Sequence, residues 1–339
     1  MKYLISADRL KGVLIALSLA LTGSIALIGL SGSLVGAQQA ESQTKTANTI
    51  KISPVRTDVE ADPGEQKIVK ITVTNPTDQP VSVRPIQNDF VAEDEDGGAA
   101  LILEEDEYAE SHSLKRFLAP LEDITISAGE SEVIDLVINV PASAEPGGYF
   151  GALRFAPTDP ETGGQVNLSA SAASLVLLKV RGELPEKLNL TEFLVRQGSQ
   201  PGSFFTSAND LNVSARFHNE SNVHLGPFGK ISVTKGDQLV HEVDFNNKTQ
   251  RDMILPDSAR RWSIPLSGIE GLGKYTVTAT LTYGSTNQTI EVAQSFWLIP
   301  MPLLIALVAG ILLLIGLIVG AILYRRNQSS GMSLGGRRR

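Results

Sequence analysis

An acidic stretch in the first half of the chain carries the clearest pattern that could do chemistry. Asp94, Asp96 and Gly97 are spaced like the start of a calcium-binding loop. Glu105 occupies the twelfth position counted from Asp94, where such a loop places a bidentate ligand. The sixth position, normally glycine, is Ala99, and no helical pattern flanks the stretch. A speculative calcium site and a solvated acidic loop both remain open, and the charge run favours the loop.

Residues that carry catalysis in other proteins form no recognisable constellation in this sequence. The nucleophile pattern G-x-S-x-G is absent, and Ser42 and Lys45, spaced as in penicillin-recognising enzymes, fall in a polar linker. There is no cysteine, which excludes disulfides, thiolate metal sites and a cysteine nucleophile. We therefore predict a protein that is not an enzyme and has no cofactor, calcium apart. The histidines stand apart and are expected to be surface or edge-strand residues; they are His112, His218, His224 and His241.

Four aromatic residues lie outside the regular sequence patterns and are the candidates for ligand binding. Phe90 and Tyr108 flank the acidic stretch, and Phe204 and Phe205 lie in a segment rich in Gln, Ser and Gly. Exposed aromatic side chains are favoured anchors at interfaces. Packing inside the loops is an equally good interpretation, so both remain open.

The spacing of apolar residues through the middle of the chain predicts β-strands. Ile134, Leu136 and Ile138 alternate with polar residues, and a period of two is typical of half-buried strands. Similar runs recur between turn residues, and no long amphipathic helix interrupts them. The sequence therefore predicts an all-β fold of two tandem immunoglobulin-like, antiparallel β-sandwich domains, residues 49–182 and 183–296, plus one C-terminal transmembrane helix.

The two halves share residues at the ends and starts of strands, which indicates a distant internal repeat. Asn75 and Asn219 each follow a strand, and a glycine opens the later strands that carry Tyr149 and Tyr275. Asparagine supplies turn chemistry, and glycine allows a bend into the sheet. We expect corresponding residues to occupy corresponding places in the two domains.

The first residues have the composition of an export signal. Lys2, Arg9 and Lys11 precede an apolar run and a small-residue site at 35–37. This pattern predicts a cleaved signal peptide at 1–37 followed by a linker at 38–48. An uncleaved anchor is the alternative, and in either case the middle of the chain is exported.

A second apolar stretch near the other end predicts a transmembrane helix over 297–324. Trp297 suits the membrane interface at its start, and Arg325 and Arg326 begin a basic tail, 325–339, that favours the cytoplasm. We therefore predict a single-pass cell-membrane protein with an extracellular ectodomain, a cytoplasmic C-terminus and lipid contact through the helix.

The exported part is strongly acidic. Eight of the 29 basic residues and one of the 37 acidic residues lie in the signal and tail, which leaves a formal charge of −15 between them. Nucleic-acid binding needs clustered basic residues, so we exclude a nucleic-acid partner.

The order of these features resembles the WxL-interacting protein family of bacterial surface proteins. The likeness rests on Ile52-Ser53-Pro54, on Asn75-Pro76 and on the run from Pro141 to Ala152, followed by a second sandwich, one helix and a basic tail. It implies a first domain that binds peptidoglycan and a second that holds a surface protein carrying a WxL module.

The sequence thus predicts a non-enzymatic, membrane-anchored cell-surface binding or scaffold protein that holds a cell-wall glycan, a WxL-type surface protein, or both. The alternative is an accessory subunit of a membrane complex that acts through its helix. Gly316 and Gly320 have the G-x-x-x-G spacing that allows close helix packing, although such spacing is common by chance.

Overall fold

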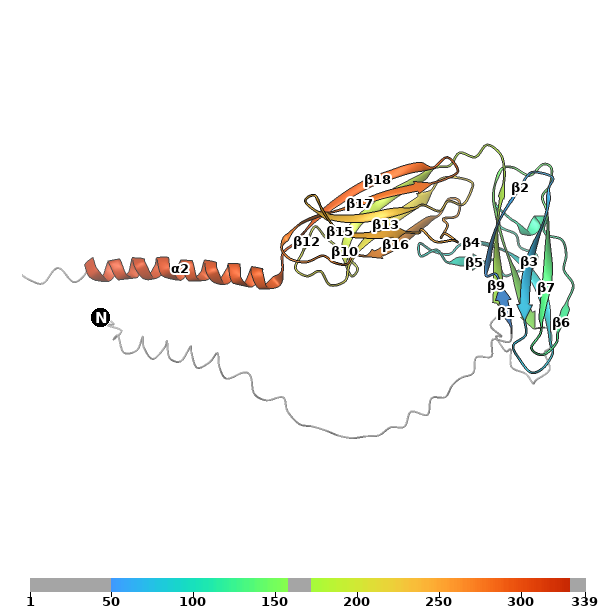
Figure 1. Ribbon diagram of the computed structural model, residues 1–339, viewed down its shortest axis with the longest axis horizontal. Coiled ribbons are helices and arrows are strands. Elements are labelled where there is room, and N and C mark those ends of the chain that lie inside the picture. The colour runs from blue at the N-terminus through green and yellow to red at the C-terminus, as the bar shows by residue number, and fades with distance from the viewer. Residues whose placement is uncertain (1–49, 158–171, 330–339) are drawn as a thin grey trace, which may run out of the picture. The chain divides into compact units, whose positions relative to one another are not determined.

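The computed structural model describes residues 50–157 and 172–329 (Figure 1). The predicted signal at 1–37, the linker at 38–48 and most of the basic tail lie outside the described residues. The described part consists of two groups of β-strands followed by one helix. The all-β class and the single C-terminal helix predicted from the sequence are confirmed.

The first group of strands forms a sandwich of two sheets. One sheet has the order β1-β3-β7, and the other has the order β2-β9-β8-β4-β5 with β6 paired to β4. A short 3₁₀ turn, Lys115–Phe117, lies between β5 and β6. The strands are β1 (Lys51–Ser53), β2 (Arg56–Ala61), β3 (Gln66–Thr74), β4 (Val81–Ala92), β5 (Ala99–Leu101), β6 (Ile124–Ile126), β7 (Ser131–Asn139), β8 (Gly147–Pro157) and β9 (Ala172–Val180).

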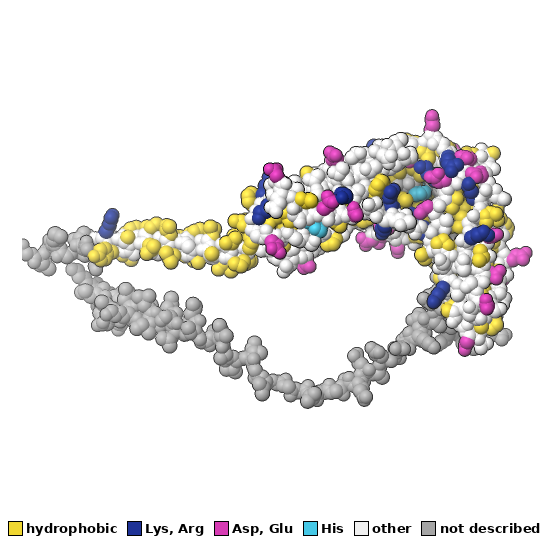
Figure 2. Space-filling view, in the orientation of Figure 1, with side chains coloured by type: hydrophobic (Ala, Val, Ile, Leu, Met, Phe, Trp, Pro, Cys, Tyr) yellow, Lys and Arg dark blue, Asp and Glu magenta, His cyan; other side chains and the backbone are white. Residues whose placement is uncertain are grey.

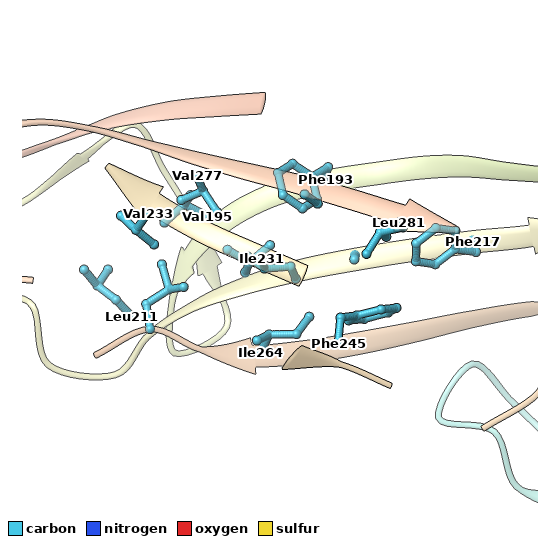
Figure 3. Packing of buried hydrophobic residues seen from close by; sticks show 14 of the residues in the cluster. Phe193, Val195, Leu211, Phe217, Ile231, Val233, Phe245, Ile264, Val277 and Leu281 are labelled. Atoms are coloured by element: carbon cyan, nitrogen blue, oxygen red, sulfur yellow. The ribbon is translucent and has the colours of Figure 1, made fainter. Parts of the chain in front are cut away.

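The second group forms another two-sheet sandwich. Its sheets have the orders β11-β10-β13-β16 and β12-β18-β17-β14-β15. Their inward side chains form one core, part of which Figure 3 shows. The strands are β10 (Leu188–Gln197), β11 (Gln200–Pro201), β12 (Phe204–Phe205), β13 (Leu211–Asn219), β14 (Phe228–Lys235), β15 (Gln238–Phe245), β16 (Ala259–Pro265), β17 (Gly273–Tyr283) and β18 (Gln288–Leu298).

The alternation in the sequence explains which face of each strand is buried. In β7, Ile134, Leu136 and Ile138 are buried, whereas Asp135 is exposed. Most strand pairs are antiparallel, as predicted. Two are parallel, β2 with β9 and β12 with β18, so the expectation of a wholly antiparallel fold is wrong at these places.

The internal repeat appears as one hydrogen-bonding pattern in both sandwiches. Asn75 and Asn219 are both fully buried. In each, the side-chain oxygen accepts the N–H two residues ahead, and the side-chain amide donates to the carbonyl four residues ahead. The amide also reaches a distant loop, at Ile126 O in the first sandwich and Ile254 O in the second.

A second shared device is a tyrosine near the start of a late strand. Tyr149 donates its hydroxyl hydrogen bond to the carbonyl of Glu145 at 2.9 Å, and Tyr275 donates to the carbonyls of Glu270 and Gly271. Such a tyrosine corner fixes the loop that leads into its strand.

The helix α2, Met301–Ser329, follows the last strand. It begins four residues later than predicted, because the strand β18 continues to Leu298, so Trp297 is a strand residue. Met301–Arg325 is long and apolar enough to cross a membrane, and its most apolar window is not buried inside the described part of the chain. Arg325 ends this apolar stretch, and Arg326 lies in the last turns of the helix.

We predict that the two buried asparagines are matched stability determinants. Replacing either with alanine (N75A, N219A) leaves buried carbonyl and N–H groups unpaired, so the free energy of unfolding should fall by about 3 kcal/mol. Urea unfolding of the full chain in detergent, followed by circular dichroism, measures it. Asn139, exposed on β7, is the control, and N139A should cost no more than about 0.5 kcal/mol. Equal losses in all three variants would contradict the prediction.

Candidate functional site

Two of the four candidate ligand-binding aromatics are core residues. Phe90 is 3% exposed in β4, and its ring lies 5.9 Å from that of Phe150. Phe205 is 6% exposed in β12, with its ring 5.7 Å from that of Phe296. The prediction that they face a partner is therefore wrong. Both lie in strands, one at the end of an unusually long strand and one in a two-residue strand, and neither strand has a clear alternating pattern.

The other two candidate aromatics are exposed. Tyr108 lies in the first sandwich, where Lys115 Nζ and the Arg116 guanidinium are each 4.7 Å from its ring centre. Phe204 lies in the second sandwich and is 70% exposed. They belong to different sandwiches and form no common site.

The acidic stretch does not form a calcium loop. Its first part, residues 93–98, is the turn of a hairpin made by β4 and β5, in which Glu93 N donates to Gly98 O. Asp94 accepts the N–H of Asp96, which closes the turn. Among the residues that the structure describes, no three acidic or histidine side chains lie close enough together to hold a metal ion, so Asp94, Asp96 and Glu105 are not assembled as ligands.

The hairpin instead holds the second sandwich. The carboxylate of Glu95 pairs with Arg216 of β13 at 2.7 Å and with Arg261 of β16 at 3.2 Å. The N–H of Arg261 also donates to the carbonyl of Glu95 at 2.6 Å, so main chain meets main chain at the edge of β16. Figure 1 shows the tip of the hairpin beside β16. The acidic insertion is therefore a clamp between the two sandwiches.

The tip of this clamp requires glycine. Gly97 has a φ of +89°, and a Cβ atom there would lie 2.2 Å from the guanidinium carbon of Arg260. The Arg260 guanidinium in turn donates to the carbonyl of Met253 and lies over the ring of Trp262. Any larger residue at position 97 would displace this arginine.

An apolar contact backs the charged clamp. Phe90, Phe150 and Leu177 of the first sandwich form a small buried cluster, against which Met253 and Leu255 of the second sandwich pack. The ring of His224, also from the second sandwich, meets Phe150 edge-on at 5.6 Å. The cluster therefore adds apolar burial to the ion pairs of the clamp.

Hydrogen bonds from two further segments complete the junction. Arg56 Nη1 donates to the carbonyl of Arg251 at 2.8 Å. Gly148 N donates to the carbonyl of Asn222, whose side chain donates back to the carbonyl of Pro146, both at 2.8 Å. In the described part of the chain, the two sandwiches are thus joined by the clamp, the apolar cluster and these two sets of hydrogen bonds, besides the covalent connection.

The junction contains hollows of different size. A cavity of about 70 Å³ lies beside Phe90 and the hairpin. A larger one, of about 420 Å³, has walls from both sandwiches and carries charges of both signs. Figure 2 shows acidic, basic and histidine side chains on this part of the surface. The larger cavity is lined by Asp58, Val59, Glu60, Lys179, His224, Thr249, Arg251 and Met253.

The charged groups around the junction are mostly paired. Hydrogen bonding from Arg216 lowers the pKa of Glu95. Burial works to raise the pKa of Glu192, but hydrogen bonds from Ser214, Arg196 and Arg261 outweigh burial and lower it. These carboxylates stay ionised and hydrogen-bonded to their partners, so neither is poised to act as a general acid near neutral pH.

His224 is the junction's unpaired titratable group. Its Nδ1 is buried without a hydrogen-bond partner in the described part of the chain. Burial lowers its pKa to about 4, although Asp58 and Glu60 act in the opposite direction. The ring is therefore neutral at ordinary pH and serves as a packing surface for Phe150.

Sequence reasoning missed the residues that make this junction. Glu95 meets Arg216 across 121 positions and Arg261 across 166. The charges themselves were visible in the sequence, but nothing in it tells which of many arginines an acidic turn will meet. His224 gave no signal because it lies in a loop without a neighbouring ligand-type residue at a useful spacing.

No family model and no curated protein matches this chain. Solved structures that resemble it include the class 5 fimbriae chaperone CfaA, with 13% identity, 73% of this chain and 98% of that chain covered, and a TM-score of 0.38. The Pseudomonas aeruginosa CupB2 chaperone has 10% identity, coverage of 72% and 99%, and a TM-score of 0.32. The E. coli chaperone DraB has 14% identity, coverage of 73% and 96%, and a TM-score of 0.32. Similarities of this size do not identify a function.

We predict that Glu95 limits motion between the sandwiches. Since the chain has no cysteine, spin labels attach only where cysteines are introduced, for example by K70C on β3 and T280C on β17. In E95Q the label-to-label distance distribution should broaden, because the ion pairs with Arg216 and Arg261 are lost. Acidification should broaden it in the wild type as well, as the pH falls below the ordinary carboxyl pKa of 4.5 and through the lowered pKa of Glu95.

The control for this measurement is E104Q, which removes an exposed carboxylate of the same acidic stretch. Its distance distribution should match the wild type. Identical distributions in E95Q and the wild type would show that the clamp does not limit the motion.

A second prediction concerns pH and His224. The unfolded chain binds a proton at His224 near pH 6.5, whereas the folded chain does so only near pH 4. The free energy of unfolding should therefore fall as the pH drops from 6.5 to 4, by up to about 1.4 kcal/mol per pH unit from this group. Urea titrations across this range give the free energy of unfolding at each pH. For the wild type it should fall with decreasing pH more steeply than for H224Q, and the difference in slope is the contribution of His224. H218Q, a change in β13, should keep the wild-type slope, and parallel curves for wild type and H224Q would refute the assignment.

Proposed function

We propose that the chain is a non-enzymatic, membrane-anchored cell-surface protein that holds a partner outside the membrane. The observation that carries this proposal is the locked junction. Domains in one chain move relative to one another unless their interface is extensive. Here the Glu95 clamp, the apolar cluster around Phe150 and the Asn222 hydrogen bonds connect the two sandwiches. Two connected sandwiches in a chain with one apolar helix suit a scaffold that presents a binding surface.

The larger junction cavity is the holding site that this proposal favours. Its walls come from both sandwiches, so its shape depends on the lock. Asp58 is already paired with Arg56, and Lys179 with Glu186, which leaves a polar surface with little unpaired charge. Such a surface suits a ligand rich in hydroxyl and amide groups. It lacks the paired nucleophile and base that hydrolysis requires.

The resemblance to the WxL-interacting proteins supports two partner classes for this site and its surroundings. One is a cell-wall glycan of the peptidoglycan type, and the other is a surface protein with a WxL module. The orientation is supported by charge, because Arg325 and Arg326 follow the apolar helix and basic residues are retained on the cytoplasmic side. The two sandwiches would then lie outside the cell.

We expect vesicles that carry the full chain to be retained by purified cell walls or to capture a purified WxL-type surface protein. T249W places a large side chain at an exposed position of the cavity rim and should reduce retention by about tenfold, as loss of one good contact region does. T286W, an exposed change in the β17–β18 turn, is the matched control and should bind normally.

The possible outcomes separate the parts of the proposal. Failure to bind either partner would overturn the holding function. Binding that T249W and T286W leave equally intact would retain the function and move the holding site away from the cavity.

A further inference from the structure

The exposed large apolar side chains of the second sandwich gather at one end of it. Residues 183–298 are all described, and their large hydrophobic side chains that remain exposed are Phe204 (70%), Leu272 (52%), Leu239 (56%) and Trp297 (41%). Isolated exposed apolar residues are ordinary, but a shared location marks an interaction surface. Figure 2 shows hydrophobic side chains along α2 and on the neighbouring end of the second sandwich.

The strand register places these residues together. Phe204 of β12 pairs with Trp297 of β18, which pairs on its other side with Lys274 of β17. Residues directly opposite in neighbouring strands point to the same face. Phe204, Trp297 and Lys274 therefore form a row across three strands.

The other two residues adjoin this row. Leu272 directly precedes Gly273, the partner of Leu298. Leu239 pairs with Thr234, and the same rung of the sheet continues through Thr276 to Ser295, two residues from Trp297. Both leucines thus lie at the end of the sheet where the chain leaves for the helix.

Main-chain hydrogen bonds tie the same end to the start of α2. Trp297 N donates to Ser203 O at 2.8 Å, and Ile299 N donates to Phe205 O at 2.8 Å. Met301 N, the first of the helix, donates to Thr206 O at 3.2 Å. The segment around β12 therefore accompanies the chain from the last strand to the first helical residue, which leaves little slack between sandwich and helix.

We propose that this end of the second sandwich is a membrane seat, in which Phe204, Trp297, Leu239 and Leu272 enter the headgroup layer of the membrane that α2 spans. The inference rests on the proposed membrane anchoring. Met301–Arg325 has 25 residues, about 37 Å as a helix, whereas the hydrocarbon core is about 30 Å thick. The first helical turn therefore reaches into the interface.

Distance and chemistry both favour lipid as the occupant. Trp297 precedes Met301 by four residues, at most about 13 Å of extended chain, so the aromatic row lies within reach of the headgroups. Aromatic side chains concentrate at that depth. Lys274 in the row and Lys235 at the end of β14 supply positive charge for anionic headgroups, beside the acidic Asp237 and Glu270 of the adjoining loops.

The test uses tryptophan emission from the full chain in vesicles of equal phosphatidylcholine and phosphatidylglycerol. The chain has two tryptophans, so W262F isolates Trp297. A nitroxide near the headgroup should quench more than about half of this emission, as for an interfacial residue. F204W, made with both natural tryptophans replaced by phenylalanine, should be quenched to a similar extent.

The matched control is T286W on the same background, in the turn at the other end of the β17–β18 hairpin, where Gln288 is nine strand residues or about 30 Å from Trp297. It should not be quenched. F204D should weaken quenching of Trp297, and because Phe204 is largely exposed it should leave unfolding unchanged. If W262F proves unstable, the difference in emission between wild type and W297F reports Trp297 instead.

Vesicle flotation separates this inference from the anchoring on which it rests. A chain that floats and resists alkaline extraction, but whose Trp297 and F204W reporters remain unquenched, overturns the seat and leaves the anchor intact. A chain that fails to float overturns the anchor itself. Loss of partner capture in F204D without any lipid quenching would assign the same surface to a protein partner and would also overturn the seat.

Discussion

The contact of Glu95 with Arg216 and Arg261 is the interaction on which the arrangement of this protein depends. Each sandwich has its own apolar core, so each could be stable without a fixed relation to the other. The hairpin that carries Glu95 joins them by ion pairs and by a main-chain hydrogen bond. Partly exposed ion pairs contribute little alone. Their effect here comes from acting with the apolar cluster around Phe150.

A chain without cysteine must stabilise its loops by other means, and the two buried asparagines show how. Asn75 and Asn219 each connect a strand end to a distant loop through a side-chain amide. The tyrosine corners at Tyr149 and Tyr275 anchor a second loop in each sandwich. These devices recur in both halves, which indicates that the halves share one structural plan.

The two ends of the second sandwich have different tasks in this arrangement. One joins the first sandwich through Asn222, His224 and Met253, and borders an open hollow with charged side chains. The other leads into α2 and carries the exposed aromatic row of Phe204 and Trp297. Buried polar contacts fix a domain junction, whereas exposed apolar side chains suit a lipid surface. Under the proposed function, the same domain therefore connects the holding site to the membrane anchor.

The sequence by itself determined the all-β class, the two sandwiches, the apolar helix and the repeat, because local alternation and turn residues report on burial within a strand. It did not assign β16 and placed the end of β18 in the helix, because charged and aromatic residues mask the alternation there. Only the tertiary structure decided that Phe90 is core, that the acidic stretch is a clamp and that Phe204 stands beside Trp297. Each of these depends on a contact between residues far apart in the chain, and local sequence carries no information about which distant surface a side chain will meet.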